Sequence, residues 1–393
     1  MRKVPVKYDF DHVIDRRHSD STKWRHYEAD VLPLWTADMD FVSPAPVMEA
    51  LAERIGHGIF GYCVESDELR QVVAARMASL YGWHVQPEAV LFQTGVLAGF
   101  RQVCRAAAAA REGVLVQPPV YPPIFGAPAH NGSIHQESPL IRRESGRYEI
   151  DFDAFESAIT PETRVFILCN PHNPVGRVFT RPELEKLAET CVRHDVVICS
   201  DEIHADLVFG AHRHTPIASI DPEVARRSVT LMAPSKTYNV AGLRCSMAIV
   251  PDAELRRRLQ DEHTKVFAEV NSLGLVAALA AYRDGQEWLE QVLAYLEVNR
   301  NLVVDFVRRE LPGITTDTPE ATYLAWLDCR QGGIQGNAYQ FFLDHGRVAL
   351  QDGAAFGTTG EGFVRLNFGC PRTTLVEALG RMKRALGSRM TAT

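Results

Sequence analysis

Three polar side chains stand at the ends of three short apolar runs. Asn173 follows the run RVFILCN, Asp201 ends the run VVICSD, and Lys236 follows the run SVTLMAP. If these runs are strands of one parallel sheet, their carboxyl ends meet at the edge where open α/β sheets bind ligands. An amide, a carboxylate and an amine would then converge on one crevice.

Lys236 and Asp201 each have a structural and a functional interpretation. A lysine is rarely buried without a partner, so Lys236 could form an ion pair with Asp201, and Asp201 could cap a helix. Alternatively, desolvation lowers the pKa of a lysine and makes its amine a nucleophile that forms a Schiff base. An enzyme that uses pyridoxal phosphate needs such a lysine and a carboxylate on the pyridine nitrogen.

An anion site is also expected near these residues. Gly95, Val96 and Leu97 stand between an expected strand and an expected helix, where backbone N–H groups and the helix dipole suit a phosphate. Ser235 offers a hydroxyl beside the lysine, and Arg244 offers a charged fork. Each signal is weak alone, but together they agree with a phosphate-bearing cofactor.

Composition excludes several classes of protein. The chain has 393 residues with 49 acidic and 42 basic side chains, which give a net charge of -7. This acidic balance argues against a nucleic-acid partner. No apolar stretch reaches the roughly 18 residues of a membrane span, and the first residues do not resemble a signal peptide. We therefore expect a cytoplasmic enzyme or binding protein that does not associate with membranes.

Cysteine and histidine give no metal signature. The eight cysteines lack CxxC spacing, and several lie in apolar runs, so we expect them to be reduced and buried. His212 and His214 form HxH in a polar segment without a third ligand, which predicts a solvated loop and no metal site.

Apolar runs and helical segments alternate along much of the chain. This alternation predicts an α/β fold with a mostly parallel sheet covered by helices on both faces. From about Gly285 a long amphipathic helix precedes alternating strands, which predicts a smaller α+β domain. We expect a large domain over residues 46–284, a small domain over 285–393, and an N-terminal segment, 1–45, that packs with the small domain.

One motif is misleading. Gly56 to Gly61 matches the GxGxxG dinucleotide fingerprint, but it follows a helical pattern instead of a strand. We interpret it as a loop; the alternative, dinucleotide binding, predicts NAD(P) affinity and no coloured cofactor.

The motifs resemble those of a known family. Asn173, Asp201 and the stretch around Lys236 are similar to fold-type I pyridoxal phosphate enzymes, the aspartate aminotransferase superfamily. More narrowly, motifs between about Pro33 and Arg372 resemble the MalY/PatB cystathionine β-lyases: PLWTADMDF, GYCVESDELR, PPVYPPIF, NPHNPVGRVFT, SDEIHADLVF, APSKTYNVAGL, ATYLAWLD and FVRLNFGCPR.

The resemblance implies a role for each matching residue. Lys236 would hold the cofactor as a Schiff base and move protons at the substrate Cα, while Asp201 would pair with the pyridinium. Asn173 and His204 would lie near the ring hydroxyl, and Tyr121 would stack on the ring.

Further roles concern the phosphate and the substrate. Tyr62 would reach the phosphate from the partner subunit of a homodimer, and Arg365 would clamp the substrate carboxylate. Arg244 matches the phosphate-binding arginine of the broad superfamily and does not distinguish lyases from aminotransferases. Asp38, like Asp40, could face the substrate pocket or cap a turn.

The implied activity is α,β-elimination from cystathionine-type amino acids, which gives a thiol, pyruvate and ammonia. An aminotransferase is the nearest alternative, because it shares every step up to the carbanion. A regulatory protein that keeps the cofactor but acts on a transcription factor is an alternative of another class; it predicts that Lys236→Ala retains the full cellular effect.

Overall fold

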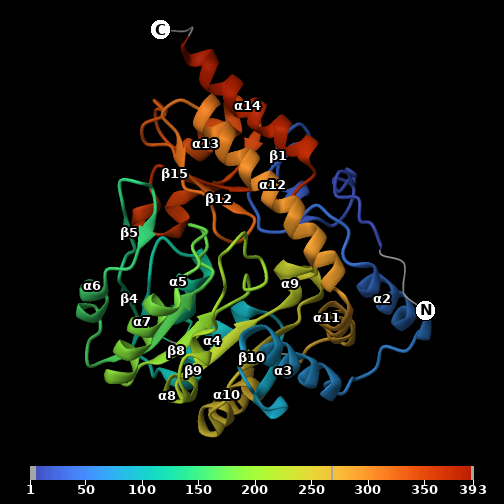
Figure 1. Ribbon diagram of the computed structural model, residues 1–393, viewed down its shortest axis with the longest axis vertical. Helices are drawn as coiled ribbons and strands as arrows, with labels where there is room; N and C mark the ends of the chain where they lie inside the picture. Colours follow the sequence, from blue (N-terminus) through green and yellow to red (C-terminus); the bar gives the residue numbers. More distant parts are fainter. Residues whose placement is uncertain (1–5, 131, 267–268, 391–393) are drawn as a thin grey trace.

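The computed structural model describes residues 6–130, 132–266 and 269–390, which are built around a seven-stranded sheet (Figure 1). In spatial order its strands are β2 (Val90–Gln93), β10 (Ser246–Ile249), β9 (Ser228–Met232), β8 (Val197–Asp201), β7 (Thr163–Cys169), β3 (Gly113–Val116) and β4 (Ile134–Glu137). Neighbouring strands from β4 to β9 run parallel, whereas β10 is antiparallel to both β9 and β2. The predicted α/β fold with a mostly parallel sheet is confirmed.

Helices cover both faces of this sheet, which explains why its central strands read as continuous apolar runs. One face packs against α4 (Val96–Ala107), α5 (Pro122–Ala129) and α10 (Ala253–Val266). The other face packs against α3 (Asp67–Tyr81), α6 (Phe152–Ser157), α7 (Arg181–Arg193), α8 (Pro222–Arg226) and α11 (Ser272–Asp284). Helix α2 (Ala45–His57) packs against α11.

Helix α4 ends inside a run of alanines. The alanine run from Ala106 to Ala110 suits a helix, but α4 ends at Ala107, and Ala108 has extended backbone angles and is buried. The N–H of Arg111 then bonds to the carbonyl of Gly132, because the chain must turn into β3. Tertiary contacts here override helix propensity.

A second, antiparallel sheet lies above the first in Figure 1. It consists of β11 (Thr315–Thr316), β12 (Leu324–Asp328), β15 (Phe363–Asn367) and β14 (Gln351–Asp352). It is accompanied by α12 (Gln286–Glu310), α13 (Ala338–Gly346) and α14 (Arg372–Met390). The N-terminal segment returns to this region, since β1 (Leu32–Pro33) pairs in parallel with β13 (Val348–Ala349). The division at residues 45 and 284 stays a prediction, and residues 1–5 and 391–393 lie outside the described chain.

The remaining elements are short: α1 (Thr22–Arg25), α9 (Pro234–Thr237), β5 (Ile141–Arg142), β6 (Tyr148–Glu149), and the 3₁₀ turns η1 (Pro87–Ala89), η2 (Ile217–Ser219), η3 (Ala241–Leu243), η4 (Gly353–Phe356) and η5 (Thr358–Gly360). Within the described ranges, every helix is too short or too polar to cross a bilayer. None of the eight cysteines, all of which lie in the described ranges, forms a disulfide, and all but the half-buried Cys63 are buried, as expected.

Candidate active site

Lys236 lies in α9, a single helical turn that follows β9. Its Nζ donates a hydrogen bond of 2.5 Å to the carbonyl oxygen of Ala37. Burial lowers the pKa of the Lys236 amine to about 8, although the charges of Asp38 and Asp201 oppose the shift. Among the described residues no ion pair joins Lys236 to Asp201, so the structural salt bridge is not formed. A buried amine with a lowered pKa can act as a nucleophile near neutral pH.

Asp201 ends β8, between Cys169 of β7 and Leu231 of β9. One carboxylate oxygen accepts a 3.2 Å hydrogen bond from the N–H of Ile203, and the other lies 3.9 Å from the Cys169 sulfur. Residues 203–206 form turns, so Asp201 closes a turn and does not cap a helix. Burial raises the pKa of this carboxyl to about 7. A buried carboxylate of this kind needs a cation beside it, and a protonated pyridine nitrogen would provide one.

Arg365 comes from the small sheet and is only 3% exposed, which rules out a surface strand residue. Its two terminal nitrogens donate hydrogen bonds of 2.9 Å to the amide oxygen of Asn173 and to the carbonyl of Trp35. Its Nε has no partner, and no carboxylate of the described chain lies within ion-pair distance. Burial lowers the pKa of this guanidinium to about 10. Arg365 is therefore a buried cation without an anion.

His204 and two tyrosines complete the aromatic part of the site. His204 is buried, its Nδ1 has no partner, and burial together with the charges of Lys236 and Arg365 lowers its pKa to about 3. Its ring lies 6.0 Å from that of Tyr323, whose hydroxyl donates to the Ala37 carbonyl at 3.0 Å. Tyr121 stands immediately before α5, and burial raises its pKa while the charge of Arg365 opposes this.

The predicted phosphate residues lie at the same edge of the sheet. Gly95 precedes α4 with φ of +149°, a backbone conformation that favours glycine, and Val96 and Leu97 begin the helix. Ser235 belongs to the turn that carries Lys236. Arg244 precedes β10, which runs antiparallel, so it lies at this edge too, exposed and in the left-handed region with φ of +50°. The backbone N–H groups of residues 95–97 and the side chains of Ser235 and Arg244 therefore stand at one edge, as the predicted anion site requires.

The turn over residues 35–40 forms a wall of the site that sequence reasoning only partly found. Its backbone carbonyls at Trp35 and Ala37 receive Arg365 and Lys236. Asp40 is buried against Lys23 at 2.8 Å and against Arg16 at 2.5 Å, so its role is structural. The motif PLWTADMDF was the sequence signal for this turn. It drew attention to the Asp38 and Asp40 carboxylates and not to the backbone carbonyls of residues 35 and 37.

Asp38 differs from Asp40 in its exposure and its neighbours. Its side chain is about a quarter exposed and lies 3.0 Å from Arg16 and 3.5 Å from Lys23. Its charge acts on the Lys236 amine. Asp38 therefore borders the site, whereas Asp40 holds the turn in place.

Tyr62 is not brought into the site of its own chain. It lies in an extended segment after α2, and its side chain is fully exposed. The GxGxxG match ends in the same segment: Gly58 closes α2 in a left-handed conformation, so the element immediately before the match is a helix and not a strand. The loop interpretation holds for residues 58–61, whereas Gly56 and His57 form the end of α2.

The prediction for His214 was wrong. Its side chain is buried and lies 2.7 Å from the Glu202 carboxylate, which also accepts hydrogen bonds from Ser200 and the N–H of Ile217. The polar residues around HxH indicated an exposed loop, and the local sequence gave no sign that Glu202 is the partner of His214. Within the described residues, no three His, Cys, Asp or Glu side chains gather as metal ligands.

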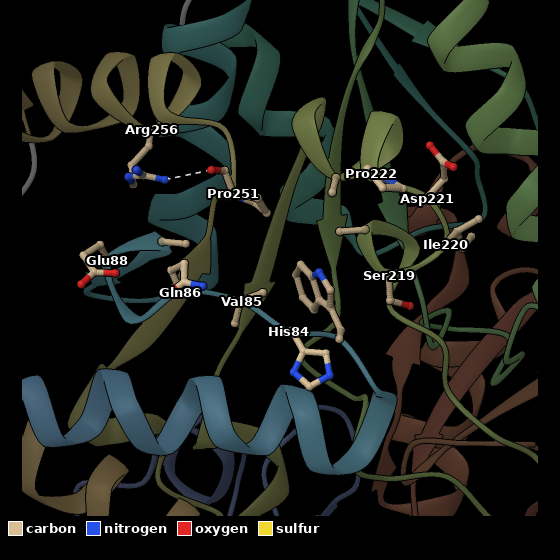
Figure 2. A pocket seen from close by; sticks show the side chains of 14 residues that line it. His84, Val85, Gln86, Glu88, Ser219, Ile220, Asp221, Pro222, Pro251 and Arg256 are labelled. Atoms are coloured by element: carbon tan, nitrogen blue, oxygen red, sulfur yellow. Dashed lines mark hydrogen bonds between the residues drawn. The ribbon is translucent and has the colours of Figure 1, made fainter.

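A separate cavity of about 580 Å³ lies at the opposite end of the large sheet (Figure 2). Its lining comes from the segments before β2 and β9 and from Pro251 after β10. Arg256 donates to the Val250 and Pro251 carbonyls, and Asp221 caps α8, so these charged groups already have partners (Figure 2). This cavity is distinct from the crevice that contains Lys236.

Comparison with known proteins agrees with this geometry. Residues 29–382 match the family model described as aminotransferase class I and II. Cystathionine beta-lyase PatB of Bacillus subtilis is 40% identical over 386 residues, which cover 96% of this chain and 100% of that protein.

Solved structures share the whole fold. The crystal structure of OvoB has 43% identity and a TM-score of 0.93, with 97% of this chain and 100% of that chain covered. The PLP-bound C-S lyase from Staphylococcus hominis has 34% identity and a TM-score of 0.91, with 97% and 98% covered.

Proposed function

Since this chain belongs to the class I and II aminotransferase family, we propose that it is a pyridoxal-phosphate-dependent carbon–sulfur lyase of the cystathionine β-lyase type. The relatives named as cystathionine β-lyase and C-S lyase support this activity. The observation that carries the proposal is the half-buried Lys236, whose amine has a lowered pKa. It shares one edge of the sheet with the buried Asp201 carboxylate and with Arg365, a buried cation without an anion among the described residues.

The residues present fit the cofactor. Buried polar groups at this edge lack partners in the described chain, among them Nδ1 of His204 and Nε of Arg365. When bound, pyridoxal phosphate supplies an electron sink for negative charge that develops at the substrate α-carbon. Lys236 would hold the cofactor covalently, and Asp201 would keep the proton on the ring nitrogen. Asn173, His204 and Tyr121 would line the ring.

The phosphate would be held by Gly95, Val96, Leu97, Ser235 and Arg244. The α4 N-terminus presents its unpaired N–H groups there, where the helix dipole favours negative charge. Tyr62 would join them from a second copy of the chain. Exposed apolar neighbours of Tyr62 support a subunit contact in this segment, because Phe60 and Val64 are also largely exposed.

Arg365 would bind the α-carboxylate of the amino-acid substrate. The two neutral oxygens that it contacts orient the guanidinium but do not neutralise it. A buried cation without an anion is costly, and a carboxylate that binds the planar fork removes that cost. The substrate amine would then lie near Lys236, and Asp38 would border the pocket.

Lys236 would take up the proton from the substrate Cα once the substrate amine has displaced it. Its lowered pKa makes it a suitable base near neutral pH. Cleavage of the Cβ–S bond releases a thiol and aminoacrylate, which water converts to pyruvate and ammonia. Tyr121, whose raised pKa keeps its proton, and Lys236 are the candidates for protonating the departing sulfur.

An aminotransferase is the second candidate, because the matching family model carries that description. The two activities separate when the purified protein is incubated with cystathionine and without a keto acid. The proposal predicts pyruvate and thiol in equal amounts, and no product from Lys236→Ala. Turnover only in the presence of a keto-acid acceptor would replace the lyase by the aminotransferase.

A further inference from the structure

A buried ion pair lies directly behind the turn that carries Lys236. Arg76, in α3, donates a 2.7 Å hydrogen bond to one oxygen of Asp206, and their side chains are 13% and 9% exposed. The other oxygen of Asp206 accepts a hydrogen bond of 3.2 Å from the hydroxyl of Thr237. Thr237 immediately follows Lys236, so the pair is linked to the reactive turn through one side chain.

The pair is mostly buried among neutral aromatic groups. The groups that face it are Tyr81, Tyr238 and Tyr282, and burial raises the pKa of each, so all three stay neutral. The Arg76 guanidinium lies 5.0 Å from the ring centre of Tyr282. A neighbouring void of about 10 Å³ is at the lower limit for a single water. This void has room for at most one water molecule.

The turn needs such support because α9 has only four residues. Two backbone hydrogen bonds span the turn, from the Tyr238 N–H to the Pro234 carbonyl at 2.8 Å and from the Val240 N–H to the Ser235 carbonyl at 3.2 Å. A single helical turn is marginal in isolation, because its few hydrogen bonds do not offset the cost of nucleation. Two side chains of the turn bind other segments: the Lys236 amine donates to the Ala37 carbonyl, and the Thr237 hydroxyl donates to the Asp206 carboxylate.

We propose that Arg76 and Asp206 are positioning residues that act through Thr237 to direct the Lys236 amine toward the cofactor. This inference rests on the proposed role of Lys236 as the cofactor-binding lysine. Arg76 also ties the turn to α3, which begins directly after the exposed segment that contains Tyr62. One ion pair thus connects the covalent attachment point to the segment expected to reach the phosphate.

The test uses the apoprotein and follows how fast it forms the covalent adduct with added pyridoxal phosphate. Thr237→Val removes the hydroxyl at nearly constant volume, and Thr237→Ser restores it. We expect Thr237→Val to slow adduct formation about tenfold or more, as a small misplacement of a reacting group does. We expect Thr237→Ser to remain within about twofold of the parent.

A matched control is Thr163→Val, because Thr163 is also buried and its hydroxyl donates to Gln136 at 2.8 Å, but at the opposite end of the sheet. It should leave the rate unchanged. In an Asp206→Asn background, the further effect of Thr237→Val should largely disappear, because both changes interrupt one interaction.

Three results would overturn the inference: a Thr237→Val rate equal to that of the parent, an equal loss in Thr237→Ser, or an undiminished Thr237→Val effect in the Asp206→Asn background. Borohydride labelling distinguishes a failure of this inference from a failure of the proposed function. A label on Lys236 with unchanged rates removes only the positioning role, whereas a label elsewhere in the parent protein removes the proposed function.

Discussion

The Lys236 amine and the carbonyl of Ala37 meet at 2.5 Å although 199 positions separate them in the chain. The Tyr323 hydroxyl donates to the same carbonyl, and Arg365 donates to the neighbouring carbonyl of Trp35. The N-terminal segment is therefore part of the candidate active site, where its backbone carbonyls contact both the Lys236 amine and the Arg365 guanidinium.

Replacing Arg365 with lysine should weaken substrate use and leave the protein folded. Lysine keeps the charge but loses the planar fork that contacts Asn173 and Trp35. We expect kcat/KM for cystathionine to fall about 100-fold or more, mainly through KM. Steady-state pyruvate release measures this, with the exposed Arg330→Lys as control. A kcat/KM equal to that of the parent would contradict the assigned role.

The Lys236 amine should react with aldehydes at unusually low pH. Burial lowers its pKa to about 8, so the neutral amine predominates above that pH, whereas a free lysine amine titrates near 10.4. In the apoprotein, the rate of modification of Lys236 should rise with pH to a plateau with a midpoint near 8. Peptide mapping after timed reductive labelling gives the midpoint, with N-acetyllysine as reference. A midpoint at the reference value would mean that burial does not activate this amine.

Asp201→Asn should make the apoprotein more stable and the enzyme less active. Burial raises the pKa of Asp201 from 3.8 to about 7, so in the apoprotein the folded state binds more protons than the unfolded state between these values. Stability is therefore lost as pH rises through 7, and asparagine avoids this loss. At pH 8 the apoprotein variant should be more stable by on the order of a few kcal/mol, at about 1.4 kcal/mol per pKa unit.

Urea unfolding at pH 8 and at pH 4 measures this difference, and the gain should shrink at the lower pH. The same variant should lose about 100-fold or more in kcat, because the ring nitrogen loses its charged partner. A variant that is less stable than the parent apoprotein at pH 8 would show that the carboxylate has a partner of its own.

Tyr62→Phe should weaken cofactor retention across a subunit contact. The Tyr62 side chain is fully exposed in the single chain, so only a second copy can bring it to a phosphate. We expect sedimentation to show a dimer and Tyr62→Phe to raise the Kd for pyridoxal phosphate about tenfold to 100-fold, the range for one hydrogen bond to a charged group. An unchanged Kd, with Val64→Ala as control, would remove Tyr62 from the site.

The local sequence was sufficient to place a residue in the fold where its position follows from a single strand. Asp201 and Lys236 were placed correctly at one sheet edge because β8 and β9 are apolar runs that end there. For Arg365 the local sequence was not sufficient, because both faces of β15 are buried and alternation along the strand does not reveal its burial.

Contacts between distant segments were not predictable in the same way. The carbonyls of residues 35 and 37 carry no side-chain signal, and the Arg76–Asp206 pair joins residues 130 positions apart. His214 was mistaken for a solvated residue because its partner, Glu202, lies on another segment. Burial of polar groups depends on such pairings, which tertiary packing alone determines.

The central claim is that the Lys236 amine binds pyridoxal phosphate covalently. The most direct test is to load the protein with the cofactor, reduce it with borohydride and map the labelled peptide. The account predicts a protein with visible colour and a single pyridoxyl label on Lys236. A label on any other residue, or a colourless protein that takes up no label, would contradict it.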